Sequence, residues 1–241
     1  MVDVGAQRGN TLAGFVQAGW DVVAFEPDPV NLAELKQRFH SVDNLEIHGV
    51  AVSDRNADDV EFFGSAQSSG ISGLLRFHDT HEVVTHVALR TLRSLLGDLD
   101  RPIDFLKIDT EGHDLAVLRG CDLTESPPKL VVAEFDENKA LHGGHTLFEI
   151  ESYLSSNGYS SFVSEWQPIV KYGGNHQWAQ LIGDSSQLSD SRAWGNIVAS
   201  QDIDHLARVR DAIAISVPVA DQNARQQELA RKVARSIRRT S

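Results

Sequence analysis

Three acidic residues and a histidine crowd into one short stretch of the chain, FLKIDTEGHDLAVLRG, at residues 105–120. An apolar run ends at Ile108, and Asp109, Glu111, His113 and Asp114 follow it. Carboxylates crowded at the end of a buried strand repel one another and lose hydration, so a ligand or a cation is expected to offset the cost. The alternative is a solvated turn that caps the next helix.

A glycine turn near the N-terminus is the second candidate site. VDVGAQRGNT (residues 2–11) has the pattern of a strand, a turn and a helix start, in which Gly5 permits a tight turn and Gly9 a close approach of the helix. The strand DVVAF (residues 21–25) then ends at Glu26, where a carboxylate can accept hydrogen bonds from a ribose diol. Together these residues predict a nucleoside site.

The residue before the glycine turn indicates which nucleoside. A dinucleotide site has G-x-G-x-x-G, with a helix N-terminus that faces the pyrophosphate. Here Asp3 lies two residues before Gly5, where its charge repels pyrophosphate but suits a cationic, amino-bearing ligand. S-adenosylmethionine carries a sulfonium, an α-amino group and an adenosine, so it is favoured over a nicotinamide cofactor. A glycine turn without a ligand is the structural alternative.

Strands and helices alternate along the chain. Strands are expected at residues 1–4, 21–25, 45–52, 60–63, 103–108, 130–135, 159–163 and 197–200, the last closing the sheet, and helices at 10–19, 31–40, 91–96, 114–119 and 147–156. This order predicts an α/β fold with a doubly wound, mostly parallel, Rossmann-like sheet. Ligands of such sheets bind beyond the carboxyl ends of the strands. Residues 3–9, Glu26, Asp54, Asp109 and Glu134 all fall at or just after such ends.

Two stretches and the C-terminal segment stand apart from this pattern. Residues 64–82 are rich in glycine and serine and residues 165–195 contain several aromatic residues, so both are expected to be loops that build an acceptor pocket. We expect one domain over residues 1–201 and a helical, basic extension over residues 202–241. Residues 222–241 carry a net charge of +5, against −17 for the rest of the chain. A solvated or docked helix explains this extension, and a contact with an acidic partner, a membrane surface or a second subunit is the alternative.

The composition restricts the class of protein. A net charge of −12 argues against a nucleic-acid partner, because phosphates require a basic surface. No apolar run reaches 18 residues, so no membrane span is expected, and the N-terminus lacks the pattern of a signal peptide. The single cysteine, Cys121, cannot form an internal disulfide and fits a reducing compartment. A cytoplasmic protein is therefore expected.

Several of these stretches occur together in one known family. The sequence resembles the FkbM-type family of S-adenosylmethionine-dependent methyltransferases. The matching pieces are VDVGAQRGNT, AFEPDP (24–29), VAVSD (50–54), TLRSLL (91–96) and FLKIDTEGHDLAVLRG, with a weaker match at WGNIVAS (194–200). The resemblance implies a class I methyltransferase sheet, an S-adenosylmethionine donor, and an acceptor hydroxyl on a sugar, a glycan or another small natural product.

The resemblance also assigns residues to donor binding. These are Asp3, Gly5, Ala6, Gly9, Glu26, Pro27, Ala51 and Val52. The chain departs from the family at Arg93, where relatives usually have aspartate, and it begins at the first strand, where relatives carry more sequence upstream. Either the chain is a fragment, or its C-terminal segment supplies the missing cover.

The acidic stretch is expected to carry the chemistry of methyl transfer. A sugar hydroxyl has a high pKa, so a base or a metal is needed as it attacks. Asp109 and Glu111 are the central catalytic candidates, and His113 is the third. One carboxylate could hold the amino group of the donor, one could accept the proton, and the set could bind Mg²⁺ together with Glu134 or Asp136. The HGGH run at residues 142–145 matches no standard zinc spacing and is expected to be a solvated loop.

Two functions therefore remain open from the sequence. The first is an O-methyltransferase that acts on a small molecule or a glycan. The second is a non-catalytic module with the same fold that docks into a larger biosynthetic assembly. A nucleobase substrate is disfavoured, because the turn after Ile108 is Asp-Thr-Glu-Gly and lacks the Asn/Asp-Pro-Pro-aromatic pattern of enzymes that methylate base amino groups. The acceptor, the metal dependence and the oligomeric state are not specified by the sequence.

Overall fold

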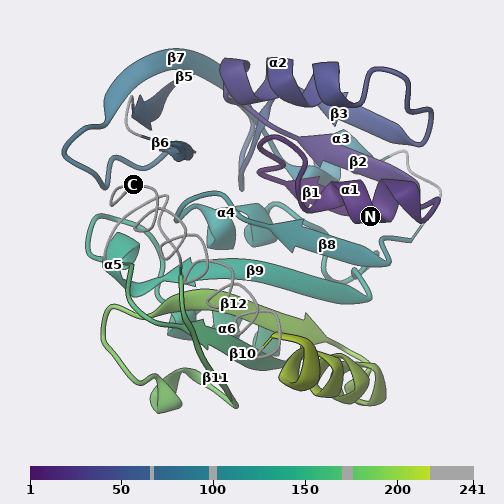
Figure 1. Ribbon diagram of the computed structural model, residues 1–241, viewed down its shortest axis with the longest axis vertical. Helices are drawn as coiled ribbons and strands as arrows, with labels where there is room; N and C mark the ends of the chain where they lie inside the picture. The colour runs from purple at the N-terminus through teal and green to yellow at the C-terminus, as the bar shows by residue number, and fades with distance from the viewer. Residues whose placement is uncertain (66–67, 98–101, 170–175, 218–241) are drawn as a thin grey trace, which may run out of the picture.

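A computed structural model describes residues 1–65, 68–97, 102–169 and 176–217. Its main sheet has eight strands in the order β11–β10–β12–β9–β8–β1–β2–β3 (Figure 1). In chain order these are β1 (Val2–Val4), β2 (Val22–Phe25), β3 (Leu45–His48), β8 (Phe105–Ile108), β9 (Leu130–Asp136), β10 (Ser160–Trp166), β11 (Trp178–Ile182) and β12 (Trp194–Ser200).

Strand β1 lies at the point where the order of the sheet reverses. It pairs in parallel with β2 on one side and with β8 on the other, so that Val4 lies between Phe25 and Ile108. Strands β2 and β3 are also parallel, as are β8 and β9. The carboxyl ends of β1, β2, β8 and β9 therefore meet at one edge, which is where ligands bind in doubly wound sheets. The predicted fold class is confirmed.

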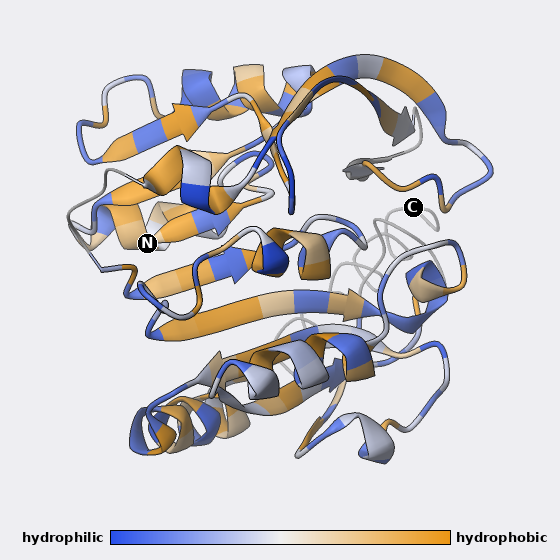
Figure 2. Ribbon diagram, turned by 180° about the vertical axis from the view of Figure 1, so that it is seen from behind, coloured by the Kyte–Doolittle hydropathy of each residue, from blue (hydrophilic) through white to orange (hydrophobic). Residues whose placement is uncertain are grey.

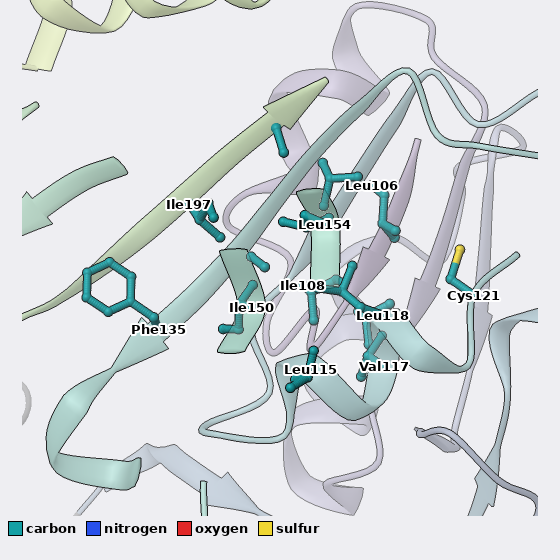
Figure 3. Close-up of a cluster of buried hydrophobic side chains, with 14 of the residues drawn as sticks. Leu106, Ile108, Leu115, Val117, Leu118, Cys121, Phe135, Ile150, Leu154 and Ile197 are labelled. Carbon is teal, nitrogen blue, oxygen red and sulfur yellow. The ribbon is translucent and has the colours of Figure 1, made fainter. Parts of the chain in front are cut away.

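Helices cover both faces of the sheet. On one face α3 (Leu92–Leu96), α4 (Asp114–Arg119) and α6 (Leu147–Ser156) bury their apolar side chains against strand residues such as Leu106, Ile108 and Ile197 (Figure 3). On the other face lie α1 (Leu12–Gln17), α2 (Pro29–Arg38) and a helix over residues 203–217. Apolar residues run along both faces of the central strands (Figure 2), as expected of a sheet buried on two sides.

A second sheet departs from the sequence prediction. It contains β4 (Ala51–Val52), β5 (Ala57–Ser65), β6 (Ser68–Gly73) and β7 (Glu82–Arg90), in the order β4–β7–β5–β6. The single strand expected over residues 45–52 is wrong, because the chain breaks at Gly49 and Val50 and its two parts enter different sheets. The loop expected over residues 64–82 is also wrong in part, because it contributes to β5 and forms β6.

The far edge of the main sheet is formed by β12, β10 and β11, with α6 packed beside them. Helix α6 has the predicted bounds, and a capping box between Thr146 and Glu149 fixes its start. Strand β12 lies inside the sheet, antiparallel to β9 and β10, so the expectation that residues 197–200 close the sheet is wrong. The edge strand is β11, which lies inside the predicted 165–195 loop.

The helix over residues 203–217 packs through Leu206, Val209 and Ile213 against β10 and β12. The rest of the predicted extension, with the basic residues of 222–241, lies outside the described residues. Among the described helices, none is both long and apolar enough to cross a membrane.

Candidate functional site

The glycine turn after β1 is built by close backbone approach. The N–H groups of Gly5 and Ala6 both donate to the carbonyl oxygen of Phe25, at 3.0 Å each, which fixes the turn to the end of β2. Gly5 has φ +77°, and a Cβ placed there would lie 1.9 Å from the carbonyl oxygen of Asp109. Only glycine allows this contact, so the turn after β1 and the turn after β8 lie directly against each other.

Glu26 is held in place at the end of β2. Its carboxylate accepts hydrogen bonds from the N–H of Gln7 at 2.7 Å and from the N–H of Asp28 at 2.8 Å. Asp28 in turn caps α2 by accepting from the N–H of Val30. Burial raises the pKa of Glu26 to about 7, although the two backbone hydrogen bonds favour the charged form. Each carboxylate oxygen has a second lone pair, so a ribose diol can still bind.

An apolar recess lies between the glycine turn and the second sheet. Thr110 Oγ1 is buried there and has no hydrogen-bond partner among the described residues. The recess contains four of the predicted donor-binding residues and is lined by Val4, Gly5, Phe25, Pro27, Val50, Ala51, Val52, Phe62, Gly73, Leu74 and Thr110. An apolar slot with an unsatisfied hydroxyl suits a flat, nitrogen-bearing ring such as adenine.

These three features fit S-adenosylmethionine. The recess suits its adenine, Glu26 suits its ribose diol, and the glycine turn leaves backbone space for the methionine part. Two further predicted donor-binding residues support the turn itself. Ala6 is buried, and its carbonyl oxygen accepts from the N–H of Gly9 at 2.8 Å. Gly9 allows α2 to approach, since a Cβ there would lie 2.7 Å from Leu35.

Asp3 lies beneath the turn and is fully buried. Its carboxylate pairs with the ammonium of Lys107 at 3.1 Å, and the same ammonium lies 3.5 Å from Asp109 and donates to the carbonyl oxygen of Gly5 at 2.9 Å. Burial lowers the pKa of Lys107, but the charges of Asp109 and Asp3 outweigh it and raise the pKa overall. Lys107 therefore ties the glycine turn to the acidic turn.

The acidic stretch after β8 is a strained turn organised by one of its own carboxylates. Glu111 and Gly112 have φ +57° and +96°. Asp114 is buried and accepts from the N–H groups of Thr110 at 3.2 Å and Gly112 at 3.3 Å. Asp114 thus stabilises the turn, so Asp109 and Glu111 are the carboxylates of this stretch that can contact a ligand.

A second lysine lies among the acids. The ammonium of Lys139, from the short helix α5 (Glu137–Ala140), lies 2.6 Å from Glu111, 2.8 Å from Glu134 and 3.6 Å from Asp136. Oxygens of Asp109, Glu111 and Glu134 converge within 4.8 Å. Burial raises the pKa of Glu111 to about 7; Lys139 opposes this shift and Asp109 adds to it. Burial also raises the pKa of Glu134, and Lys139 opposes this shift as well.

His113 is directed toward another neighbour. Its Nε2 lies 2.9 Å from Ser53 Oγ, at the end of β4. Burial, followed by the nearby His145, lowers the pKa of His113 to about 4, so the imidazole is neutral at pH 7. Among the described residues the imidazole of His113 is hydrogen-bonded to Ser53, and its role as a base stays a prediction.

Part of the predicted loop at residues 64–82 covers the acidic turn. The ring of Phe77 lies 5.4 Å from the ammonium of Lys139. A Cβ on Gly73 would lie 3.3 Å from the Cβ of Glu111, and one on Gly112 would lie 3.0 Å from Leu75. This segment therefore encloses the site from the side of the second sheet.

Sequence reasoning missed both lysines. Lys107 carried a usable signal, because a lysine inside a strand buried on two faces must find an acidic partner. Lys139 carried a weaker signal: Glu134 and Asp136 lie five and three residues before it, whereas Glu111 lies in a turn 28 residues earlier. The predicted HGGH run is placed in a turn, where His142 Nδ1 lies 3.0 Å from the carbonyl oxygen of Asn138.

Comparison with known proteins gives the family. The model of the methyltransferase FkbM domain matches residues 3–161. No curated protein matches. A crystal structure of the methyltransferase FkbM from Methylobacillus flagellatus KT is similar, with a TM-score of 0.47 and 17% identity over 83% of this chain and 42% of that one. A precorrin-6y C5,15-methyltransferase from Geobacter metallireducens GS-15 has a TM-score of 0.40 and 14% identity over 84% of this chain and 78% of that one.

This chain thus spans less than half of the Methylobacillus protein. The domain match covers most of the chain and contains both the glycine turn and the acidic turn. The chain belongs to the FkbM methyltransferase family.

Proposed function

We propose that the protein is an S-adenosylmethionine-dependent methyltransferase that methylates a hydroxyl group of a sugar, a glycan or another small natural product. The observation that carries the proposal is the backbone contact between the glycine turn and the acidic turn, at Gly5 and Asp109. It sets an apolar recess beside a cluster of convergent carboxylates, Asp109, Glu111 and Glu134.

The donor side of this proposal rests on shape and hydrogen bonding. S-adenosylmethionine supplies an electrophilic methyl group on a positively charged sulfur. The apolar recess excludes water around the ring, and Glu26 orients the ribose through the oxygen lone pairs that Gln7 and Asp28 leave open. Lys107 keeps the two turns in register, since it binds Asp3, Asp109 and the carbonyl oxygen of Gly5 together.

The acceptor side rests on the acids. As the acceptor oxygen forms its bond to the methyl carbon, its proton must pass to a base. Asp109 and Glu111 are the candidates, and a carboxylate with a pKa of about 7, such as Glu111, is closer to the ideal for a base at neutral pH than an ordinary carboxylate. His113 is the third candidate, and its contact with Ser53 makes it a weaker one.

The test is calorimetric titration of S-adenosylhomocysteine into the wild type and the Glu26→Gln variant. We expect saturable binding by the wild type and a loss of about tenfold or more in the variant, because the amide of glutamine replaces one of the two oxygens that hold the ribose diol with an NH2 group. Glu125→Gln is the matched control, since Glu125 is exposed, lies away from the site and loses the same charge. Circular dichroism verifies that all three proteins fold.

Each result has a separate meaning. Binding that Glu26→Gln weakens and Glu125→Gln does not supports the donor site, and product formation on hydroxylated glycans then tests catalysis. Donor binding without methyl transfer to any hydroxylated acceptor supports the alternative, a non-catalytic module within a larger assembly. Absence of binding by the folded wild type refutes the proposal for this chain.

A further inference from the structure

The ammonium of Lys139 has the surroundings of a bound cation. It lies 2.6 Å from Glu111 Oε2 and 2.8 Å from Glu134 Oε2, with Asp136 Oδ2 at 3.6 Å. Its three partners come from the turn after β8, from the middle of β9 and from the end of β9. The side chain of Lys139 is only 2% exposed. One lysine therefore joins the turn after β8, which contributes one carboxylate, to β9, which contributes two.

The backbone, the stem and the ammonium of Lys139 are each fixed by neighbouring residues. Asp136 caps α5 by accepting from the N–H groups of Asn138 and Lys139, which fixes the backbone of the lysine. The ring of Phe77 covers the ammonium at 5.4 Å, and the stem packs against the turn at Gly112. A buried ion pair of this kind persists only where geometry and hydrogen bonds compensate for lost hydration.

The same carboxylates have the composition of a divalent-cation site. Oxygens of Asp109, Glu111 and Glu134 lie within 4.8 Å of one another, and convergent carboxylate oxygens are the ligands that Mg²⁺, Mn²⁺ and Ca²⁺ prefer. Carboxylates brought this close repel one another unless a positive charge lies between them. In this chain the ammonium of Lys139 supplies that charge to Glu111 and Glu134, and the ammonium of Lys107 lies beside Asp109.

We propose that Lys139 is a positioning residue that takes the place of a divalent metal ion, so that the acidic cluster is assembled without one. The ammonium joins Glu111 and Glu134 through one oxygen of each carboxylate, and it thereby positions the side chain of Glu111 for its proposed part in methyl transfer. The role in catalysis rests on the proposed function, whereas the cation site itself does not.

The experiment removes the ammonium and offers a metal in its place. Mn²⁺ binding to the wild type, Lys139→Ala and Lys139→Arg is followed by the loss of the free-ion signal in electron paramagnetic resonance. We expect Lys139→Ala to bind Mn²⁺ on the order of tenfold or more tighter than the wild type, and Lys139→Arg to match the wild type because it keeps the charge. Adding Glu134→Gln to Lys139→Ala should remove the gained site.

Lys129→Ala is the matched control. Lys129 is an exposed lysine that also pairs with an aspartate, Asp104, so its removal also leaves one carboxylate unpaired. It should gain no Mn²⁺ site, because no further carboxylate contacts Lys129 among its described ion pairs.

A second measurement, the melting temperature with and without Mn²⁺, tests the inference even if Lys139→Ala folds poorly. The wild type should melt at the same temperature with EDTA and with Mn²⁺, whereas Lys139→Ala should melt higher with Mn²⁺ or fold only in its presence. Stabilisation of the wild type by Mn²⁺, or no gain of Mn²⁺ binding in folded Lys139→Ala, would overturn the inference. Neither arm uses a methyl donor, so its failure leaves the proposed function standing, and the reverse also holds.

Discussion

Substitution of Gly5 by alanine should destabilise the protein for two physical reasons, backbone strain and a steric clash. The backbone at Gly5 has φ +77°, where a side chain is strained, and the new Cβ would lie 1.9 Å from the carbonyl oxygen of Asp109. The first effect is local to the residue. The second pushes β1 away from β8 at the centre of the sheet.

Three other glycines isolate these effects. Gly19 has φ +80° but open space around it, so alanine there meets strain alone. Gly120 has an ordinary φ but a Cβ would lie 1.9 Å from the carbonyl oxygen of Ser53, so alanine there meets the clash alone. Gly14 lies in α1 with neither feature.

The expected changes in the free energy of unfolding follow from the two effects. Left-handed strain costs about 1–2 kcal/mol, and forcing extra volume into a packed interior costs about 1–3 kcal/mol. Gly19→Ala and Gly120→Ala should each show one of these losses, and Gly5→Ala should lose roughly 2–5 kcal/mol, near their sum. Gly14→Ala should gain about 0.5–1 kcal/mol, since glycine inside a helix is unfavourable.

Urea unfolding followed by circular dichroism measures all four variants, and the midpoints give the differences at constant slope. Calorimetry with S-adenosylhomocysteine adds a second readout, because among these variants Gly5→Ala alone alters the predicted donor site. A Gly5→Ala variant no less stable than Gly19→Ala would refute the reasoning, since the contact with Asp109 would then have no energetic weight.

Three further outcomes are expected. Burial raises the pKa of Glu26 from 4.5 to about 7, so between these pH values the folded protein keeps a proton that the unfolded chain releases. The free energy of unfolding should therefore fall by at most about 3 kcal/mol as the pH rises from 4.5 to 7. Urea unfolding at several pH values should show a shallower fall in Glu26→Gln. The imidazole of His113 should titrate near pH 4 in a nuclear magnetic resonance titration of the folded protein. Because the unfolded chain binds the same proton already at about pH 6.5, the free energy of unfolding should also fall as the pH drops from 6.5 to 4. Burial raises the pKa of the Cys121 thiol to about 12, so Ellman's reagent should react with it rapidly only in urea.

The sequence was informative where local rules decide the structure. The helix predicted at residues 147–156 has the bounds of α6, and the apolar run at residues 130–135 predicted β9 to within one residue. Glu26 could be placed because its position depends only on the end of a strand and the start of the next helix. The same local logic located the acidic turn after Ile108.

Long-range pairing explains what local rules missed. Strand β7, over Glu82–Arg90, has exposed valines at positions 83 and 84 and gains order by pairing with β5 and β4 in the second sheet. Residues 45–52 look like one apolar strand, and only the second sheet divides them. Lys139 was missed for a related reason, since the fold brings the distant Glu111 to the same ammonium as the neighbouring Glu134 and Asp136.

The position of β1 has a consequence for how the chain folds. Val2–Val4 pairs with Leu106–Ile108, and every element from α1 to α3 lies between them in the sequence. Closing so long a loop for so few paired residues is slow, because its entropic cost precedes the contacts that compensate for it. The contact between Gly5 and Asp109 can exist only after that closure. A ligand that requires this contact would bind no partly folded form, so the rate at which S-adenosylhomocysteine binding appears during refolding would report the completion of the sheet.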